Sequence, residues 1–295
     1  MSHITVQICG GLGNQMFQYA MGRALSLRHH VPLILDISWF SSPMTSNTKR
    51  EYLLDAFPYI ARSGSISRYN RYNTQKWKRI GKRILSYFFS AESIIKQPHF
   101  AYWSQIELVN PPAYLSGYWQ SEKFFSSHAT KIKQDFTFPT LPKGEASFLA
   151  QKIKSSPNTV AVHIRRGDYV TDKRAQSRHG NLPLSFYKNA LEYIKDIYGK
   201  TTIFVFSDDP TWVKEHFNYR ENSPIIVNLN FSNHPYHDMH LMSLCKHHII
   251  ANSTFSWWGA WLGTQRGLTI APTQWFADEE FEKYKDIFCK EWIIM

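Results

Sequence analysis

Apolar and polar residues alternate more regularly in the second half of the chain than in the first. Short runs rich in valine, isoleucine and phenylalanine recur there, separated by stretches with apolar residues at helical spacing. Strands and helices that alternate in this way predict an α/β fold with a doubly wound, mainly parallel sheet. We expect strands at 158–165, 201–207, 224–229, 247–252 and 268–272, and helices in 184–199, 237–246 and 254–263.

The chain begins with a strand pattern, a glycine-rich turn and a helix pattern. Residues 3–9 alternate, GGLGNQ follows, and apolar residues at helical spacing occupy 16–30. We expect Asn14 to cap this helix. The turn is not a dinucleotide fingerprint, because Met16 stands where the last glycine belongs. The glycines that permit a tight turn and the close approach of a ligand are Gly10, Gly11 and Gly13.

A segment with prolines, a glycine and a short helical stretch, residues 138–157, separates the two halves of the chain. Before it, a strand is expected at 32–38, and a strand running into a helix at 115–125. Two domains and a terminal amphipathic helix follow from this pattern, with expected bounds of 1–145, 146–275 and 276–295.

Composition narrows the class of protein. Hydrophobic residues make up 43% of the 295 residues, enough for the cores of two domains. We find neither a signal-peptide pattern nor 18 consecutive apolar residues, so we expect a cytoplasmic protein. The three cysteines are odd in number and far apart, which favours neither a disulfide framework nor a zinc ribbon: Cys9, Cys245 and Cys289.

The net charge of +11 is concentrated in one segment. Eight lysines and arginines but no acidic residue lie between Asp55 and Glu92, interleaved with aromatic residues, and we call residues 62–89 the basic segment. Nucleic acid, an anionic membrane surface or a lipid-linked anionic substrate would each fit it. A solvated helix over a hydrophobic core fits equally well.

Polar side chains follow the expected strands at their carboxyl ends, where ligands bind in open parallel sheets. Arg165 and Arg166 follow the first strand of the second half. A guanidinium holds two oxygens at once, so the arginine pair suits a phosphate or diphosphate. Solvation, or pairing with structural carboxylates, is the alternative.

Two further strand ends carry candidate ligand groups. Asp208 and Asp209 end the next strand, and a carboxylate there can accept hydrogen bonds from guanine or from ribose hydroxyls. Capping of the helix at Pro210 explains one of them as well. Three hydroxyl residues start a later helix, whose free N–H groups form an anion site or are simply capped: Ser253, Thr254 and Ser256.

Four blocks together resemble the α-1,2-fucosyltransferases of glycosyltransferase family 11. They are GGLGNQMFQYA (10–20), HIRRGDYV (163–170), FSDDPTWV (206–213) and ANSTFSWWGAWLG (251–263). The resemblance implies a two-domain GT-B-like enzyme whose second domain binds a GDP-sugar. It also implies transfer of L-fucose from GDP-β-L-fucose, with inversion, to the 2-hydroxyl of a galactose, with no metal or other cofactor. Residues 40–110 match little and are expected to set acceptor choice.

The same resemblance assigns roles to the candidate residues. Arg165 and Arg166 would bind the diphosphate, with His163 a nucleotide contact and Asp208 or Asp209 the guanine reader. The hydroxyls of Ser253, Thr254 and Ser256 would form a phosphate turn. The glycine turn would face the fucose or the acceptor through Gly11, Gly13, Asn14 and Gln15.

The catalytic base is the least determined role. Asp168 is the acidic residue nearest Arg165, and Asp172 and His179 are alternatives. Related fucosyltransferase families carry a glutamate eight residues after the corresponding arginine, but Lys173 stands there in this chain. We therefore place Asp168 with Arg165 as the catalytic pair. The alternative is that Asp168 holds Arg165 or Arg166 in position.

The expected partners are GDP-fucose and a glycan acceptor of bacterial surface polysaccharide, such as O-antigen, carried on a polyprenyl diphosphate. The basic segment would then contact the inner membrane face peripherally. Alternatives are transfer of another GDP-sugar, a non-catalytic nucleic-acid or membrane binder, and a nucleotide-dependent oxidoreductase, which lacks its fingerprint. A zinc site on His234, His237 and His240 is disfavoured by Pro235.

Overall fold

The structure is a computed structural model that describes residues 2–41, 50–63, 66–69, 92–219, 223–229 and 234–295, apart from the side chain of Asp168. The chain divides into two compact units. The amino-terminal unit is Met1–Pro139 with Lys285–Ile287, and the carboxyl-terminal unit is Thr140–Tyr284 with Phe288–Met295. Most of the basic segment lies outside the described residues. Among the described residues, no helix combines the length and apolar character needed to span a bilayer.

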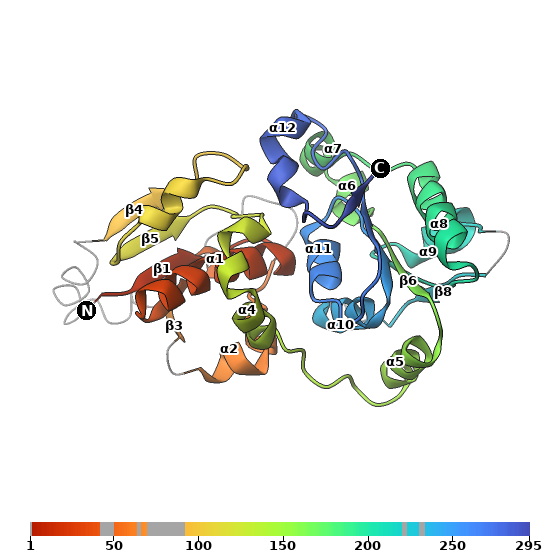
Figure 1. Ribbon diagram of the computed structural model, residues 1–295, viewed down its shortest axis with the longest axis horizontal. Coiled ribbons are helices and arrows are strands. Elements are labelled where there is room, and N and C mark those ends of the chain that lie inside the picture. Colours follow the sequence, from red (N-terminus) through yellow and green to blue (C-terminus); the bar gives the residue numbers. More distant parts are fainter. Residues whose placement is uncertain (1, 42–49, 64–65, 70–91, 220–222, 230–233) are drawn as a thin grey trace. The chain divides into compact units, whose positions relative to one another are not determined.

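The described part of the amino-terminal unit contains a parallel sheet in the order β3-β2-β1-β5-β4 (Figure 1). Strand β1 leads through the glycine turn into the long helix α1, and the chain then adds β2 and β3 on one side of β1 and β5 on the other. The strands are β1 (Ile4–Gln7), β2 (Leu33–Asp36), β3 (Ile66–Tyr69), β4 (Ser93–Lys96) and β5 (Ala113–Ser116). The α-helices are α1 (Leu12–His29), α2 (Pro58–Arg62) and α4 (Ala129–Asp135).

Two expectations for this unit are wrong. Helix α1 begins at Leu12, with Gly11 as its amino-terminal cap, so Asn14 lies inside the first turn and is not the cap. The reason is Gly10, whose φ of 76° completes the turn three residues earlier than a cap at Asn14 would. The segment after β5 forms short 3-10 turns, Glu122–Phe124 and Ser126–His128, where we expected a helix. The other 3-10 turns are Ser38–Ser41, Leu54–Ala56 and Ser104–Leu108.

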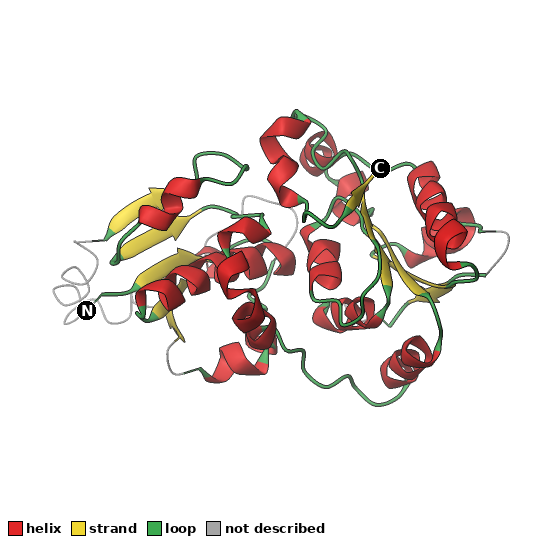
Figure 2. Ribbon diagram, viewed as in Figure 1, coloured by secondary structure: helices red, strands yellow, loops and turns green. Residues whose placement is uncertain are grey.

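The carboxyl-terminal unit contains a parallel sheet in the order β11-β10-β9-β6-β7-β8. Figure 2 draws the strands in yellow and the helices in red. The chain proceeds outward from β6 to β8, then crosses back to β9 and proceeds outward on the other side. The topological switch point therefore lies between β6 and β9. Its strands are β6 (Thr159–Ile164), β7 (Thr202–Ser207), β8 (Ile225–Val227), β9 (His247–Ile249), β10 (Thr269–Ala271) and β11 (Ile293–Ile294).

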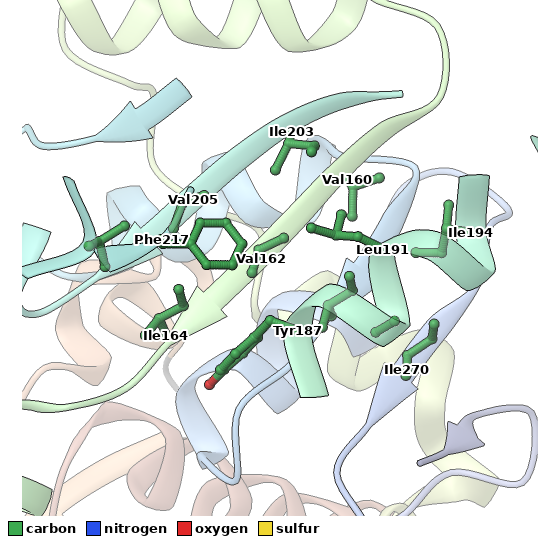
Figure 3. Close-up of a cluster of buried hydrophobic side chains, with 13 residues drawn as sticks. Val160, Val162, Ile164, Tyr187, Leu191, Ile194, Ile203, Val205, Phe217 and Ile270 are labelled. Atoms are coloured by element: carbon green, nitrogen blue, oxygen red, sulfur yellow. The ribbon is translucent and has the colours of Figure 1, made fainter. Parts of the chain in front are cut away.

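Helices cover both faces of this sheet because its strands bury alternate side chains on opposite faces. Val160 and Val162 of β6 pack with Leu191 of α8, as Figure 3 shows, whereas Ala161 packs with the cluster that includes residues of α5 and α10. The helices are α5 (Glu145–Ser155), α6 (Gly167–Thr171), α7 (Lys173–His179), α8 (Leu184–Tyr198), α9 (Pro210–His216), α10 (Tyr236–Leu244), α11 (Thr254–Trp261) and α12 (Phe281–Tyr284). The doubly wound parallel sheet expected for this half is confirmed.

The terminal amphipathic helix expected over 276–295 is wrong. Only the short α12 and a 3-10 turn, Lys285–Ile287, form there, and the chain ends as β11. Without β11, strand β10 would have an unpaired edge. With β11 in place, Met295 donates its N–H to the Ala271 carbonyl at 3.0 Å. Pairing with that edge satisfies backbone groups that an isolated helix end would leave to water, so the tertiary contact overrides the helical pattern.

Candidate functional site

The first part of the site lies where β6 and β7 end side by side. Ile164 is paired in register with Ser207, so the next residues of the two strands, Arg165 and Asp208, are neighbours. Arg165 Nη1 lies 2.9 Å from Asp208 Oδ2, and the two side chains are 21% and 25% exposed. The pair is therefore an ion pair at the surface of the carboxyl edge, within reach of a ligand.

Asp208 also organises the turn that follows β6. Its Oδ1 accepts a hydrogen bond from the backbone N–H of Arg166 at 2.9 Å. A side chain on Gly167 would place its Cβ 2.3 Å from Asp208 Oδ2, which is shorter than any real contact. A side chain at position 167 would therefore force the Asp208 carboxylate to shift, and this carboxylate contacts both the Arg165 side chain and the Arg166 backbone.

Arg166 is held by the start of α9. Its Nε lies 3.3 Å from Asp209 Oδ2, and its guanidinium stands 3.6 Å from the ring centroid of Trp212. Asp209 is the cap of α9, accepting from the backbone N–H of Trp212 at 3.1 Å. Capping of the helix at Pro210 therefore explains Asp209, and both oxygens of that carboxylate have partners.

The other side of the switch point is the end of β9 and the start of α11. Ser253 caps α11, accepting from the Phe255 N–H at 3.4 Å, and Thr254 is the partly exposed first residue of the helix. Ser256 is fully buried and donates to the carbonyls of Ala251 and Ser253. The Ser256 hydroxyl is therefore already used in hydrogen bonds to the backbone at the start of α11.

Tyr169 connects the two sides, and sequence reasoning passed over it. Its hydroxyl donates to the Asn252 carbonyl at 3.0 Å, and the Arg165 guanidinium lies 5.6 Å from its ring centroid. The ring also stacks on His179 at 4.7 Å. A tyrosine directly after the RRGD motif could have indicated this role, because its ring packs among apolar groups while its hydroxyl makes a hydrogen bond.

The base candidates have different surroundings. Asp172 caps α7, accepting from the Arg174 N–H at 2.8 Å. His179 lies between Tyr169 and Phe276, with the latter ring 5.5 Å away. Asp168 belongs to α6, next to the arginine pair in sequence, but its side chain lies outside the described residues. Its assignment as the base stays a prediction.

His163 points to the face of the sheet opposite Val162, because side chains alternate along β6. It is 4% exposed, with its ring 5.5 Å from that of Phe255. Burial lowers the pKa of His163 to about 4, against the opposing effect of Asp208. In the described residues its Nδ1 has no hydrogen-bond partner. His163 is therefore a neutral imidazole beneath the start of α11.

Asp238 was missed by sequence reasoning. It lies in the first turn of α10, which runs back from the end of β8, so this turn belongs to the same carboxyl edge as Arg165. Burial raises the pKa of Asp238 to about 6, and among the described residues its Oδ1 has no partner.

No group of three or more His, Cys, Asp or Glu within the described ranges is arranged to hold a metal ion.

The glycine turn of the amino-terminal unit is surrounded by amide side chains, whereas the carboxyl-terminal site contains arginines and carboxylates. Gln15 is fully buried and its amide donates to the carbonyls of Gly10 and Glu51 and accepts from the Leu53 N–H, so it fixes the 51–53 segment. Asn14 is partly exposed and accepts from Gln120 Nε2 at 2.9 Å.

The two glycines of the predicted cleft differ in exposure. Gly13 is buried within α1, whereas Gly11 is partly exposed at its start. Arg50 Nη1 lies 3.7 Å from where a Gly11 side chain would be. The partly exposed members of this cleft prediction are therefore Gly11 and Asn14.

Comparison with known sequences identifies the family. Residues 84–295 match Glycosyl transferase family 11. The chain belongs to glycosyltransferase family 11. An α-1,2-colitosyltransferase of Escherichia coli is 34% identical, covering 99% of both chains. The O-antigen biosynthesis glycosyltransferase WbnK of Escherichia coli is 33% identical over 94% of this chain and 96% of its own.

Solved structures of low sequence identity show the fold of this family 11 chain. NodZ α-1,6-fucosyltransferase superposes with a TM-score of 0.50 at 13% identity, covering 88% of this chain and 92% of its own. ADP-heptose LPS heptosyltransferase II of E. coli gives the same TM-score at 10% identity, covering 99% and 90%. With its two parallel α/β units, the chain has the two-domain GT-B-like fold expected from the sequence.

Proposed function

We propose that this family 11 glycosyltransferase transfers L-fucose from GDP-β-L-fucose to the 2-hydroxyl of a galactose in a bacterial surface glycan such as O-antigen. The observation that carries the proposal is the Arg165–Asp208 pair beside the start of α11 at the switch point. An arginine and a helix amino terminus are the groups that a nucleotide diphosphate requires. A relative named for O-antigen biosynthesis supports the glycan class.

Colitose is the second candidate sugar, because a relative that matches the whole chain is an α-1,2-colitosyltransferase. Colitose is L-fucose without its 3-hydroxyl group, so the two donors differ by a single polar contact. A site that hydrogen-bonds this hydroxyl would reject colitose strongly, whereas an apolar pocket would tolerate both. Sugar choice therefore depends on one contact to the sugar and leaves the binding of GDP unchanged.

In the proposed reaction the acceptor oxygen attacks the anomeric carbon from the side opposite the diphosphate. The new bond forms between that oxygen and carbon, the carbon–oxygen bond to the diphosphate breaks, and GDP leaves with the electron pair. Arg165 would exchange Asp208 for a phosphate oxygen, with the N–H groups at the start of α11 adding positive potential. Asp168 would accept the proton of the hydroxyl. We propose that these groups make a divalent metal unnecessary.

Guanine recognition needs a carboxylate with free lone pairs, because the ring edge presents N–H donors. Asp209 has both oxygens engaged by Arg166 and Trp212, whereas Asp208 would release one oxygen when Arg165 binds a phosphate. Asp238 already has an oxygen without a partner in the described residues. We therefore test Asp238→Asn beside Asp208→Asn and Asp209→Asn. The reading carboxylate is the one whose loss removes the preference for GDP over ADP in calorimetry.

The deciding experiment is calorimetry and transfer assay of the purified protein with GDP-fucose, GDP-colitose, GDP-mannose and UDP-galactose, each with and without EDTA. We expect transfer from GDP-fucose or GDP-colitose to a β-galactoside, with an α-1,2 product by NMR and no effect of EDTA. Transfer only from UDP-galactose, or complete inactivation by EDTA, would contradict the proposal.

The membrane contact also stays a proposal. Replacing Lys76, Lys78, Arg79, Lys82 and Arg83 by Gln should abolish flotation with anionic liposomes at moderate salt while transfer to a free oligosaccharide continues, because each charge near an anionic surface contributes about 1 kcal/mol. Unchanged flotation would end this idea. Arg68→Gln is the control, because Arg68 already forms an ion pair with Asp55 within the amino-terminal unit and its loss should leave flotation unchanged.

A further inference from the structure

Two aromatic rings lie together at the carboxyl edge of the amino-terminal sheet. Phe100 follows β4 and Tyr118 follows β5, and these two strands are neighbours in the sheet. The ring planes are within 10° of parallel, and their centroids are 6.2 Å apart. Direct face-to-face contact needs only about 3.5–4 Å, so the rings are offset and overlap little. Tyr118 is 41% exposed, so the residue reaches the protein surface.

The backbone beneath Tyr118 is held in place. Gln97 Oε1 accepts from the N–H groups of both Tyr118 and Trp119, at 2.8 and 3.0 Å. A side chain on Gly117 would place its Cβ 2.5 Å from Gln97 Cβ, so the turn closes tightly on this glutamine. Exposed aromatic rings are usually free to move, but this turn fixes the direction in which Tyr118 leaves the sheet.

The turn is also strained in a way that points to a function. Trp119 has a φ of 56°, a conformation that a bulky side chain rarely adopts, although its indole is fully buried. Within the described residues its Nε1 has no hydrogen-bond partner, and neither has Oε1 of Gln120, which is 6% exposed. A strained backbone and two unsatisfied buried polar atoms in successive residues are uncommon in a connecting loop and call for an explanation.

The chemistry of this platform suits a neutral sugar ring. A pyranose has one apolar face of C–H groups that packs on an aromatic ring and a rim of hydroxyls that exchanges hydrogen bonds with amide groups. A charged diphosphate would gain little from phenyl and phenol rings, and the arginine pair already supplies its chemistry in the other unit.

We propose that Tyr118 and Phe100 bind a pyranose ring of the acceptor glycan, with Gln97 as a positioning residue for Tyr118. This inference rests on the proposed function in one respect, that the acceptor is a glycan. It adds a substrate subsite to the amino-terminal unit, formed by residues outside the glycine turn.

The test compares Tyr118→Ala and Tyr118→Phe with wild type, using β-galactosyl-1,3-N-acetylglucosamine as acceptor. We expect the alanine variant to raise KM for the acceptor about tenfold, because its apolar contact is lost, with kcat, KM for the donor and the Kd of GDP unchanged. The phenylalanine variant should retain the wild-type KM, since the ring remains. Tyr193→Ala is the matched control, a tyrosine 39% exposed on α8.

Saturation-transfer NMR of the same disaccharide gives a second readout that requires no turnover. Saturation should be strongest on the C–H face of one ring in wild type and should be lost in Tyr118→Ala, while the circular dichroism of both proteins stays the same. An unchanged KM and unchanged saturation in the alanine variant would overturn the platform, as would a change confined to the donor KM. Absence of transfer by wild type to any galactoside, with saturation intact, would instead count against the proposed function alone.

Discussion

The carboxyl edges of the two sheets share a topology and differ in chemistry. In each unit the first strand lies inside the sheet, with later strands added on both sides, so each has a switch point beside the end of that strand. After β6 come two arginines paired with two carboxylates, whereas after β1 and β5 come glycines, amides and aromatic rings. The carboxyl edge of the second unit thus carries ion-paired arginines, and we call it the charged edge; that of the first carries mainly amide and aromatic side chains, and we call it the amide edge.

The two edges also differ in how firmly their polar groups are held. Arg165 and Asp208 are each about one-fifth to one-quarter exposed, and such pairs are worth only about 0–1 kcal/mol. In the proposed reaction, the loss of this ion pair would therefore cost little when Arg165 binds a diphosphate. Gln15 is fully buried and bonded to three backbone groups, so moving it would leave those groups unsatisfied. The ion pair at the charged edge is therefore held less firmly than the buried glutamine at the amide edge.

The largest effect is expected at the charged edge. Arg165→Ala should lower the transfer rate by ~10²–10³, because a charge-stabilising donor is lost, and Arg165→Lys should restore little, because lysine cannot hold two oxygens in a fork. Steady-state kinetics with GDP-fucose measure this. Arg266→Ala, an exposed arginine in the loop between α11 and β10, should behave as wild type. Full activity of Arg165→Ala would remove the diphosphate role.

A substitution at the amide edge should lower the stability of the fold. Gln15→Leu keeps the volume of the side chain but leaves buried backbone groups unpaired, so we expect a loss of roughly 3 kcal/mol in the free energy of unfolding. Urea titration followed by tryptophan fluorescence gives this value. Gln134→Leu, at an exposed position of α4, should change it little. A neutral result at Gln15 would show that its three hydrogen bonds contribute nothing net.

Gly167→Ala tests whether Asp208 aligns the arginine pair. The new Cβ would lie 2.3 Å from Asp208 Oδ2, so the carboxylate must move and the arginine pair loses its alignment. We expect transfer to fall about tenfold (~1.4 kcal/mol) with a weaker Kd for GDP by calorimetry. Gly144→Ala, where a Cβ meets nothing within 4 Å and only the backbone at a φ of 100° is strained, is the control. Equal behaviour of the two variants would contradict the alignment role.

The smallest effect is a pH dependence of stability from His163. Its pKa is lowered to about 4 in the folded protein from an unfolded value near 6.5, so the unfolded chain binds the extra proton. Stability from the neutral ring is complete above pH 6.5 and is lost as the pH falls toward 4, amounting to ~1 kcal/mol between pH 7 and 5.5. Denaturation of wild type and His163→Gln across this range measures it, and His30→Asn, an exposed histidine, should keep the wild-type slope. Equal slopes for wild type and His163→Gln would exclude His163.

Part of the site could be predicted from the sequence because it depends on the order of residues along single strands. Arg165 follows β6 and Asp208 follows β7 in the sequence itself, and parallel strands bring such positions to one edge. The partner choices could not be predicted in this way. That Asp208 holds Arg165 while Asp209 caps α9 and holds Arg166 depends on side-chain directions that the pattern leaves open. The Asp238 carboxyl was missed because its burial depends on how α10 packs.

The sequence alone determined the parallel α/β architecture and the family, since periodicity and four spaced motifs are local properties of the chain. Only the tertiary structure decided where a contact between distant segments overrode the local sequence pattern. The terminal segment reads as a helix, yet Ile293 and Ile294 pair with β10, because an open sheet edge supplies backbone partners that the segment cannot provide for itself. The start of α1 moved from Asn14 to Gly11 for a similarly local reason, the positive φ of Gly10, which backbone geometry sets and side-chain pattern does not reveal.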